Sequence, residues 1–192
     1  MAVIACLSKE ITCGPIYSRI HTTSFRGIDT IPVSVQVHLS NGLPAMEIVG
    51  LADKAIVESR ERVRAALSSL GLALPAKQIA VNLSPADIIK EGAHFDLPIA
   101  LGVLVAMGAL PQDAVDDHLV LGEFPLDGSI QTVSGILPAA LCAAKRSQRL
   151  ICPAENGSEA DWGGDIDILA ANSLTELLNH LFLKIVRTYI LG

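Results

Sequence analysis

The sequence has few aromatic residues and little charge. Aromatic side chains make up 4% of the 192 residues and charged ones 18%, whereas hydrophobic residues reach 51%. Because rings are scarce, the side chains of Ala, Val, Ile and Leu must fill the core of a globular protein. A chain of this length can bury about 70% of its unfolded surface, so it can fold without disulfide bonds or a structural metal.

An excess of positive charge is also missing. The formal net charge is −6. A protein whose whole surface grips nucleic acid needs clustered Lys and Arg, because each phosphate must be neutralised. The composition therefore excludes that class of protein but leaves room for a local basic patch.

Paired cysteines and long apolar segments are absent as well. Cys6, Cys13, Cys142 and Cys152 form no CxxC pair, and no His lies at zinc-finger spacing from them, which predicts reduced thiols in a cytoplasmic protein. The start of the chain has Glu10 and no long apolar stretch, so it does not resemble a signal peptide. The longest apolar run, 97–110, is shorter than the roughly 20 residues that span a bilayer. We expect a buried helix there and no membrane association.

Two common catalytic motifs do not occur. No GxxxxGK[ST] phosphate loop is present, so we expect no cofactor in this chain and no ATP hydrolysis by a P-loop mechanism. Ser84 and Ser134 lie outside any GxSxG turn, and we interpret both as turn residues.

The first half of the chain carries clear periodic patterns. Residues 18–25 show a mixed β pattern, and 32–39 alternate apolar and polar side chains with the period of two of a half-buried strand. The Asn41-Gly42 turn and the strand pattern at 45–51 predict that these two strands form a hairpin. Residues 53–71 have helical spacing, with Asp53 as N-cap and Gly71 after the C-terminus.

The second half alternates strands and helices. Residues 77–85 predict a strand, and the following apolar helix starts at Asp96, interpreted as its N-cap, and runs to about Met107. The remaining elements are a second hairpin around Asp127-Gly128 within 118–135, a helix at 136–147, a strand at 149–154, and a strand and helix within 166–181 with Ser173 and Glu176 as a capping box. The order predicts one α/β domain with a mixed sheet packed with helices.

One loop between these elements concentrates ionisable groups. The stretch SPADIIKEGAHFD, 84–96, holds Lys90, Glu91, His94 and Asp96 just before the apolar helix. His94 and Asp96 could be two metal ligands, but a third is not apparent, so we predict no metal site. The alternative is that Asp96 only caps the helix and His94 is a loop residue.

Three arginines follow each other at alternate positions of the first helix. Arg60 and Arg64 share a helix face, and Glu58 lies four residues before Arg62, at the spacing of an ion pair. We interpret them as a solvated face; the alternative, which adds Lys90, is a contact with DNA or with another subunit.

Three long motifs, taken together, resemble one known family. They are VSVQVHLSNGLPAMEIVGLADKAIVESRERVRAAL at 33–67, IAVNLSPADIIKEGAHFDLPIALGVL at 79–104 and LGEFPLDGSIQTVSGILPAAL at 121–141. They resemble, in order, the N-terminal (ChlI-type) domain of the ComM/YifB family of bacterial magnesium-chelatase-like AAA+ ATPases. The resemblance implies the fold of the Lon proteolytic domain, which is similar to domain 2 of ribosomal protein S5.

The likeness to Lon relates this loop to the active-site loop of a protease. Lon-type proteases carry their catalytic Ser in a K-D-G-P-S-A-G loop and their catalytic Lys after a G-G-L segment. Aligned with KEGAHFD and SGIL of this chain, these positions fall on His94 and Leu137. Since leucine cannot accept a proton, the resemblance implies that the Ser-Lys dyad is absent and that the domain is not a protease.

The resemblance also implies a larger context. Relatives begin near Tyr17, so 1–16 is expected to be an extension, 17–181 the domain, and 182–192 an atypical tail where relatives lead into a motor. ATP, Mg²⁺ and a hexameric ring are expected only with that motor, which is absent here. The full-length family is implied to act as a DNA branch-migration helicase in transformation and recombination. This chain would then be its non-catalytic domain for ring assembly or for engaging DNA and partners.

Two other functions compete with this one. The chain could be a stand-alone or remnant interaction domain without a role on DNA, which its net negative charge favours. It could also be a residual Ser-Lys peptidase that uses another pair, such as Ser134 with Lys145.

Overall fold

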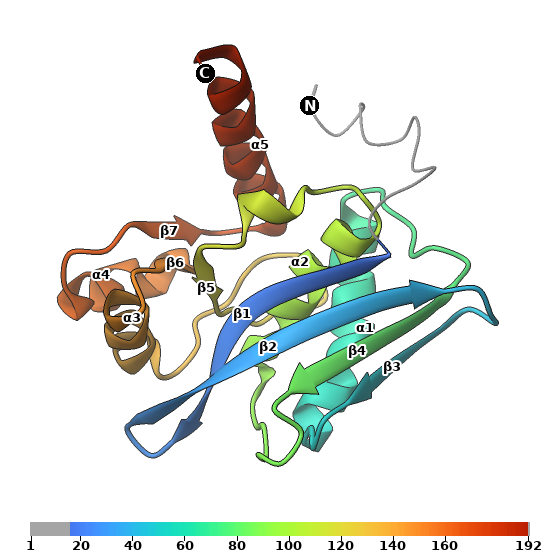
Figure 1. Ribbon diagram of the computed structural model, residues 1–192, viewed down its shortest axis with the longest axis horizontal. Helices are drawn as coiled ribbons and strands as arrows, with labels where there is room; N and C mark the ends of the chain where they lie inside the picture. The colour runs from blue at the N-terminus through green and yellow to red at the C-terminus, as the bar shows by residue number, and fades with distance from the viewer. Residues whose placement is uncertain (1–15, 192) are drawn as a thin grey trace.

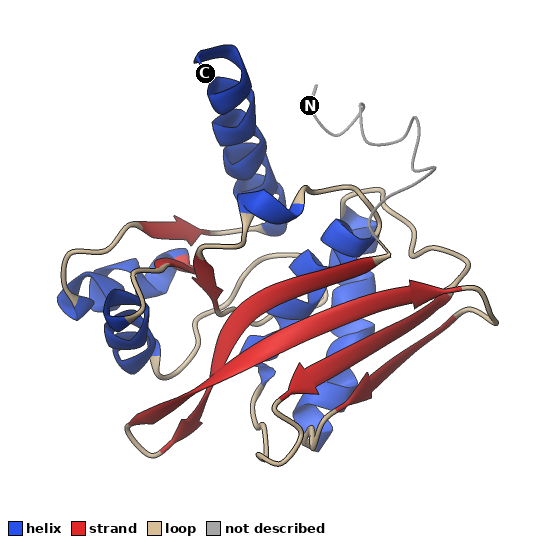
Figure 2. Ribbon diagram, in the orientation of Figure 1, coloured by secondary structure: helices blue, strands red, loops and turns tan. Residues whose placement is uncertain are grey.

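A seven-stranded sheet runs through the molecule (Figures 1 and 2). The computed structural model describes residues 16–191, and side chains as far as Leu183. The predictions for Cys6, Cys13 and most of the extension lie outside the described residues. The elements, in chain order, are β1 (Tyr17–Arg26), β2 (Asp29–Ser40), β3 (Ala45–Val49), α1 (Lys54–Ser69), β4 (Gln78–Ser84), α2 (Asp96–Ala106), β5 (His118–Val120), α3 (Ile136–Lys145), β6 (Arg149–Pro153), α4 (Gly157–Ala160), β7 (Ile168–Ala171) and α5 (Leu174–Leu191).

The sheet contains both parallel and antiparallel pairs. Its strand order is β3-β4-β2-β1-β5-β6-β7. β1 and β4 flank β2 in antiparallel fashion, whereas β3–β4, β1–β5, β5–β6 and β6–β7 are parallel. The predicted α/β class with a mixed sheet is confirmed; the likeness to Lon and to ribosomal protein S5 stays a prediction.

The predicted hairpin between 32–39 and 45–51 is wrong. β2 pairs with β1 and β4, and β3 pairs in parallel with β4 through the crossover helix α1. The tight hairpin is the one before it, β1–β2, which turns at Gly27 with φ +62°. Parallel strands need a crossover rather than a short turn, so the Asn41-Gly42 turn reverses the chain without pairing its neighbours.

The second predicted hairpin is also largely absent. Within residues 118–135 the structure has β5 and a single internal antiparallel bridge, between Glu123 and Gln131; Ser129 forms a second isolated bridge, to Ser173. Asp127-Gly128 does form a turn, in which the Asp127 carboxylate accepts hydrogen bonds from the backbone N–H and the hydroxyl of Ser129. These side-chain bonds satisfy the turn locally, so its geometry does not require a ladder of paired strands.

The other predicted strands and helices are confirmed, together with both ends of α1 and one half of the capping box of α5. Asp53 caps α1 by accepting from the Ile56 N–H at 2.8 Å, and Gly71 follows the helix with φ +73°. Ser173 accepts from the Glu176 N–H at the start of α5, but the Glu176 side chain reaches back to Asn172 rather than to Ser173. α5 continues to Leu191 and so includes most of the residues predicted as a tail.

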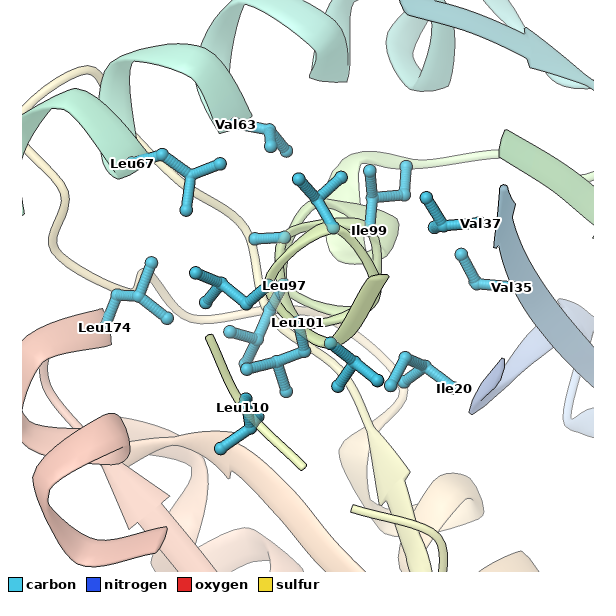
Figure 3. Close-up of a cluster of buried hydrophobic side chains, with 14 of the residues drawn as sticks. Ile20, Val35, Val37, Val63, Leu67, Leu97, Ile99, Leu101, Leu110 and Leu174 are labelled. Carbon is cyan, nitrogen blue, oxygen red and sulfur yellow. The ribbon is translucent and has the colours of Figure 1, made fainter. Parts of the chain in front are cut away.

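Helix α2 is the centre of the main core. Every one of its residues is buried, which explains why its sequence shows no polar face. Figure 3 shows its side chains among those of β1, β2, α1 and α5; the labelled residues are Ile20, Val35, Val37, Val63, Leu67, Leu97, Ile99, Leu101, Leu110 and Leu174. A Cβ at Gly102 would lie 2.7 Å from Val37 Cγ2, and the Gly102 carbonyl accepts from the Ser18 hydroxyl at 2.7 Å. Glycine therefore lets α2 pack directly on the sheet.

A second core covers the other face at the β5–β6 end. Leu119, Leu121, Leu150 and the buried free thiols of Cys142 and Cys152 pack there with α3. Burial raises the pKa of the Cys152 thiol to about 12, which makes it an unreactive thiol. Strands β1–β4 lie in front of α1 and α2 (Figures 1 and 2). Because α3 covers only the β5–β6 end, most of the outer face of β1–β4 has no described helix packed on it.

None of the described helices combines the length and the apolarity that crossing a bilayer demands.

Two leucines provide a matched test of the core. Leu101 in α2 is 0% exposed and Leu141 in α3 is 45% exposed. Leu101→Ala should lower the free energy of unfolding by about 2–5 kcal/mol, because it removes buried methyl groups and leaves a cavity. Leu141→Ala should cost less than about 1 kcal/mol, because its side chain is already hydrated. Urea denaturation measures both; equal losses would contradict the central position of α2.

Candidate functional site

The loop between β4 and α2 is fastened to the segment that follows β3. The Lys90 N–H donates to the Leu51 carbonyl at 3.0 Å, and the Asp53 N–H donates to the Lys90 carbonyl at 3.0 Å. A parallel bridge also joins Ala52 and Lys90. The backbone of the loop is therefore fixed at its middle.

The Lys90 side chain points inward. It is fully buried, and its Nζ donates to the Gly50 carbonyl at 2.8 Å and to the Pro85 carbonyl. Burial lowers the pKa of this amine, because the charged form is poorly hydrated there. Lys90 thus joins two backbone turns and does not present its charge to a partner.

One carboxylate joins the loop to helix α1. Asp53 uses Oδ1 for the helix cap, and its Oδ2 accepts from the Gly92 N–H at 3.1 Å. Gly92 has φ +99°, a conformation that side chains with a Cβ rarely adopt. The loop therefore needs glycine at 92 to direct this N–H at Asp53.

His94 is buried at the position where the Lon-like alignment places the nucleophile. Its Nε2 lies 2.9 Å from the Thr23 carbonyl, which can only accept, so Nε2 carries the proton. The ring also packs against Phe25 and Phe95, with centroids at 5.2 and 4.3 Å. Burial lowers the pKa of this imidazole, which favours the neutral form.

Asp96 and Arg62 form the strongest polar contact of the site. The guanidinium donates through Nε to Oδ2 at 2.6 Å and through Nη2 to Oδ1 at 3.0 Å, and Oδ2 also accepts from the Phe124 N–H at 3.1 Å. Asp96 is fully buried and the Arg62 side chain is 19% exposed. A bidentate pair of this kind is both directional and strong.

This contact corrects two predictions. Asp96 is the first residue of α2 rather than its N-cap, because a 3₁₀ turn, η2 (Ala93–Phe95), leads directly into the helix. Arg62 pairs with Asp96 and not with Glu58, which pairs with Lys54 at 3.5 Å. Arg62 is therefore not part of a solvated face.

The position of Arg62 on its helix does carry a signal in the sequence. Arg62 lies three residues after the buried Ser59 and four before the buried Ala66. This spacing places it on the core-facing side of α1, where an arginine needs an acidic partner. The identity of that partner, 34 residues away, is not visible in a local pattern.

The other two arginines remain at the surface. Arg60 and Arg64 both lie near Glu61, at 3.5 and 3.8 Å, with side chains 44% and 55% exposed. The structure therefore does not bring Arg60, Arg62, Arg64 and Lys90 together as one patch. A DNA or subunit contact through Arg60 and Arg64 stays a prediction.

A shallow cavity of about 350 Å³ lies beside the loop. The residues that line it are Phe25, Glu91, Gly92, Ala93, His94, Glu123, Thr132, Val133 and Ser134. Two of them are acidic and none is Lys or Arg, so these described residues offer no base of the Lon type. Leu137, the aligned lysine position, lies on α3 and is not among the lining residues.

The alternative pair of Ser134 and Lys145 is not brought together. Ser134 precedes α3 and Lys145 is its last residue. A helix rises about 1.5 Å per residue, so the two backbones are about 15 Å apart, beyond the combined reach of the two side chains.

The buried ion pair gives a stability prediction. Arg62→Met leaves the Asp96 carboxylate buried without its counter-charge and should lower the free energy of unfolding by about 3–5 kcal/mol. Arg64→Met, on the same helix but exposed, should cost less than about 1 kcal/mol. Asp96→Asn added to Arg62→Met should recover part of the loss, because the amide oxygen still accepts from Phe124. Equal effects of the two single changes would contradict the structural role of Arg62.

His94 gives a pH prediction. Its folded-state pKa lies below the ordinary 6.5, so as pH falls below 6.5 the unfolded chain takes up the proton first. The stability contributed by neutral His94 is complete above this pH and should be lost progressively below it. In His94→Gln, which can still donate to Thr23, the free energy of unfolding should fall less between pH 7.5 and 5.5. Identical pH slopes would show that His94 is not held neutral.

Comparison with known proteins identifies the family of this sequence. Residues 35–156 match the family described as subunit ChlI of Mg-chelatase. The chain is 38% identical over 162 residues to competence protein ComM of Haemophilus influenzae, covering 84% of this chain and 32% of that protein. It is 39% identical over 142 residues to the uncharacterized protein YifB of Escherichia coli, covering 74% and 28%. It is also 38% identical over 165 residues to the uncharacterized protein Mb2921c of Mycobacterium bovis, covering 85% and 33%.

The chain thus spans about a third of the length of these relatives, while the matched region contains the fixed loop, helix α2 and the Arg62–Asp96 pair. The chain belongs to the ComM/YifB family of magnesium-chelatase-like proteins.

Proposed function

We propose that this chain is the non-catalytic N-terminal domain of a ComM/YifB-like AAA+ ATPase, in which it serves ring assembly or the engagement of DNA and partners. The observation that carries the proposal is the state of the 90–96 loop. Lys90, His94 and Asp96 all hold the fold together through buried or partly buried hydrogen bonds. A loop whose ionisable groups are bonded within the protein in this way supports a structural role rather than catalysis.

The absence of a Lon-type Ser-Lys dyad supports the same conclusion. The aligned Ser position is His94, whose proton is donated to a backbone carbonyl, and the aligned Lys position is Leu137. Acyl transfer needs a nucleophile and a base within hydrogen-bond reach of each other. Ser134 lines the cavity, but Lys145 lies at the far end of α3.

ATP and Mg²⁺ belong to the motor in this proposal. The chain contains no glycine-rich loop followed by Lys and Ser or Thr, so its residues do not fit a nucleotide triphosphate held in the P-loop manner. The hexamer, the ATPase and branch migration on DNA are therefore proposed for a full-length cytoplasmic protein, with this domain attached to its motor.

The mass of the native gene product separates this proposal from a stand-alone domain. An antibody raised to the purified chain should detect in native cells a protein well above 20.2 kDa, the mass of the 192 residues. The relatives, of which the chain covers about a third, lead us to expect this result. A product of 20.2 kDa would contradict the link to a motor and favour an independent interaction protein.

A peptidase assay tests the absence of catalysis. The purified chain should not cleave unstructured casein or fluorogenic peptides, and Ser134→Ala should leave the background rate unchanged. Cleavage by the chain that disappears in Ser134→Ala, while the variant keeps its unfolding midpoint, would overturn the non-catalytic role.

A further inference from the structure

A second depression lies on the outer face of the sheet, away from the 90–96 loop. It has a volume of about 310 Å³ and is referred to below as the sheet recess. Its lining residues are Arg19, His21, Thr22, Pro32, Val33, Ser34, Gln36, Ser84 and Arg146. They come from β1, β2 and β4 and from the residue that follows α3.

The strand register explains why these polar side chains meet. His21 is opposite Ser34, and Ser34 is opposite Ser84, so one row crosses three strands. Arg19 is opposite Gln36 in the next row on the same face. The inward-facing residues of β2 between them are apolar and belong to the main core. The outer face therefore carries the polar half of the alternation.

The charges in the sheet recess have one sign. Arg19 and Arg146 bring two guanidinium groups, and none of the lining residues is acidic. Within the described residues Arg146 makes no ion pair, and the Arg19 side chain has only the Tyr17 hydroxyl, at 3.5 Å. Asp116 acts on Arg19 from outside the lining. In a chain with net charge −6, this is a local concentration of unpaired positive charge.

Neutral donors are available on the floor. The Gln36 carbonyl oxygen accepts from the Asn82 amide at 3.0 Å, which leaves the Gln36 amide nitrogen as the end that can donate to a ligand. The Ser34 hydroxyl is enclosed and has no hydrogen-bond partner among the described residues. A buried hydroxyl without a partner is costly, so it favours a polar occupant nearby.

The environment of His21 reports the same positive potential. Its pKa is lowered first by burial and then by the charges of Arg146 and Arg19, against a smaller opposing effect of Asp116. An anion placed among these groups would offset the two guanidinium charges and raise the pKa of His21.

We propose that the sheet recess binds a phosphate group. Guanidinium groups recognise both carboxylates and phosphates. Here donors come from the floor of the sheet and from Arg146 beside α3, and the oxygens of a phosphate, arranged around a tetrahedron, can accept from both at once. The volume is at the low end of the range of about 300–1,000 Å³ for small-molecule sites, which suits one phosphate with an adjoining sugar.

The phosphate can come from a nucleic-acid backbone or from a free nucleotide. The first source rests on the proposed function, because it gives this domain a way to engage DNA; the second does not. Arg60 and Arg64 lie on α1, which packs on the other face of the sheet, so a backbone bound in the recess would not use the arginines predicted from the sequence.

The test uses the full 192-residue chain and two probes. Fluorescence anisotropy measures binding of a labelled oligothymidylate, and ³¹P NMR measures binding of inorganic phosphate. Arg19→Gln and Arg146→Gln should each weaken binding about tenfold, because each removes a charged hydrogen-bond donor. Arg64→Gln is the matched control, an exposed arginine on the other side of the sheet, and should leave binding unchanged.

The two probes distinguish the sources. Oligothymidylate binding that weakens with added salt, and that depends on Arg19 and Arg146, supports a nucleic-acid backbone. Binding of inorganic phosphate alone, with the same dependence, supports a free nucleotide. No binding of either probe, or an equal loss in Arg64→Gln, would overturn the proposal. The mass of the native product does not depend on this result, so the proposed function and the phosphate site can fail separately.

The pH dependence gives an independent readout. The phosphodiesters of the oligothymidylate do not titrate near neutrality, so any proton taken up from the solvent on binding is bound by a group of the protein. Affinity should rise as pH is lowered from 7.5 to 6, because binding favours protonated His21 between Arg19, Arg146 and Asp116. His21→Gln should flatten this dependence, and an unchanged pH profile in this variant would contradict the place of the anion beside His21.

Discussion

The architecture of this domain depends on the ion pair between Arg62 and Asp96. The pair joins the middle of α1 to the first turn of α2, and Asp96 also binds the N–H of Phe124, so three segments distant in sequence meet at one carboxylate. Removing two charges from water is costly, and such a pair need not add net stability over an apolar contact. Its directional bonds do, however, allow only one orientation of α2, the helix on which the main core is built. We infer that the pair contributes more to the specificity of this helix arrangement than to the free energy of unfolding.

The same contact explains why the 90–96 loop resembles an active site without being suited to catalysis. A catalytic loop keeps polar atoms available for a substrate, whereas here Lys90, His94 and Asp96 each bond to a partner within the protein. The cavity beside the loop is lined by two glutamates, His94, apolar residues and small polar residues, without the lysine that a Lon-type serine uses as its base. By contrast, the sheet recess on the outer face has Arg19 and Arg146 without an acidic partner among the described residues, and the Gln36 amide can donate to a ligand. One face of β1–β4 thus carries the main core, whereas the opposite face holds the sheet recess.

Patterns with a short range were readable from the sequence. The alternation at Val33, Val35 and Val37 gave β2, and Asp53 and Gly71 marked the ends of α1, because these signals act over a few residues. The pairing of β3 was not readable, because the Asn41-Gly42 turn says nothing about β4, which inserts between β2 and β3 only after α1 has crossed over. Sheet order depends on the competition of all strands for neighbours, and that information is spread over the whole chain.

The candidate sites show the same limit. The sequence identified Lys90, His94 and Asp96 as unusual but assigned Asp96 to a cap, since the approach of Arg62 depends on how α1 packs. The sheet recess was not visible at all, because its residues are separated in sequence. Strand register brings Arg19, Ser34 and Ser84 to one face of the sheet, and the end of α3 adds Arg146. A short motif can identify a loop from the sequence, but a surface built from several strands can be identified only once the fold is known.

Amide hydrogen exchange of the native chain tests the central claim most directly. If the loop is a fixed part of the scaffold, the N–H groups of Lys90, Gly92, Gly122 and Phe124, all of which donate to oxygens of the protein, should exchange as slowly as those in the interior of α2. The exposed turn at Ile28 should exchange rapidly and serves as the internal reference. Exchange in the loop that is many times faster than in α2, under conditions where α2 stays protected, would show that the loop opens on its own. That result would contradict the structural role of the loop.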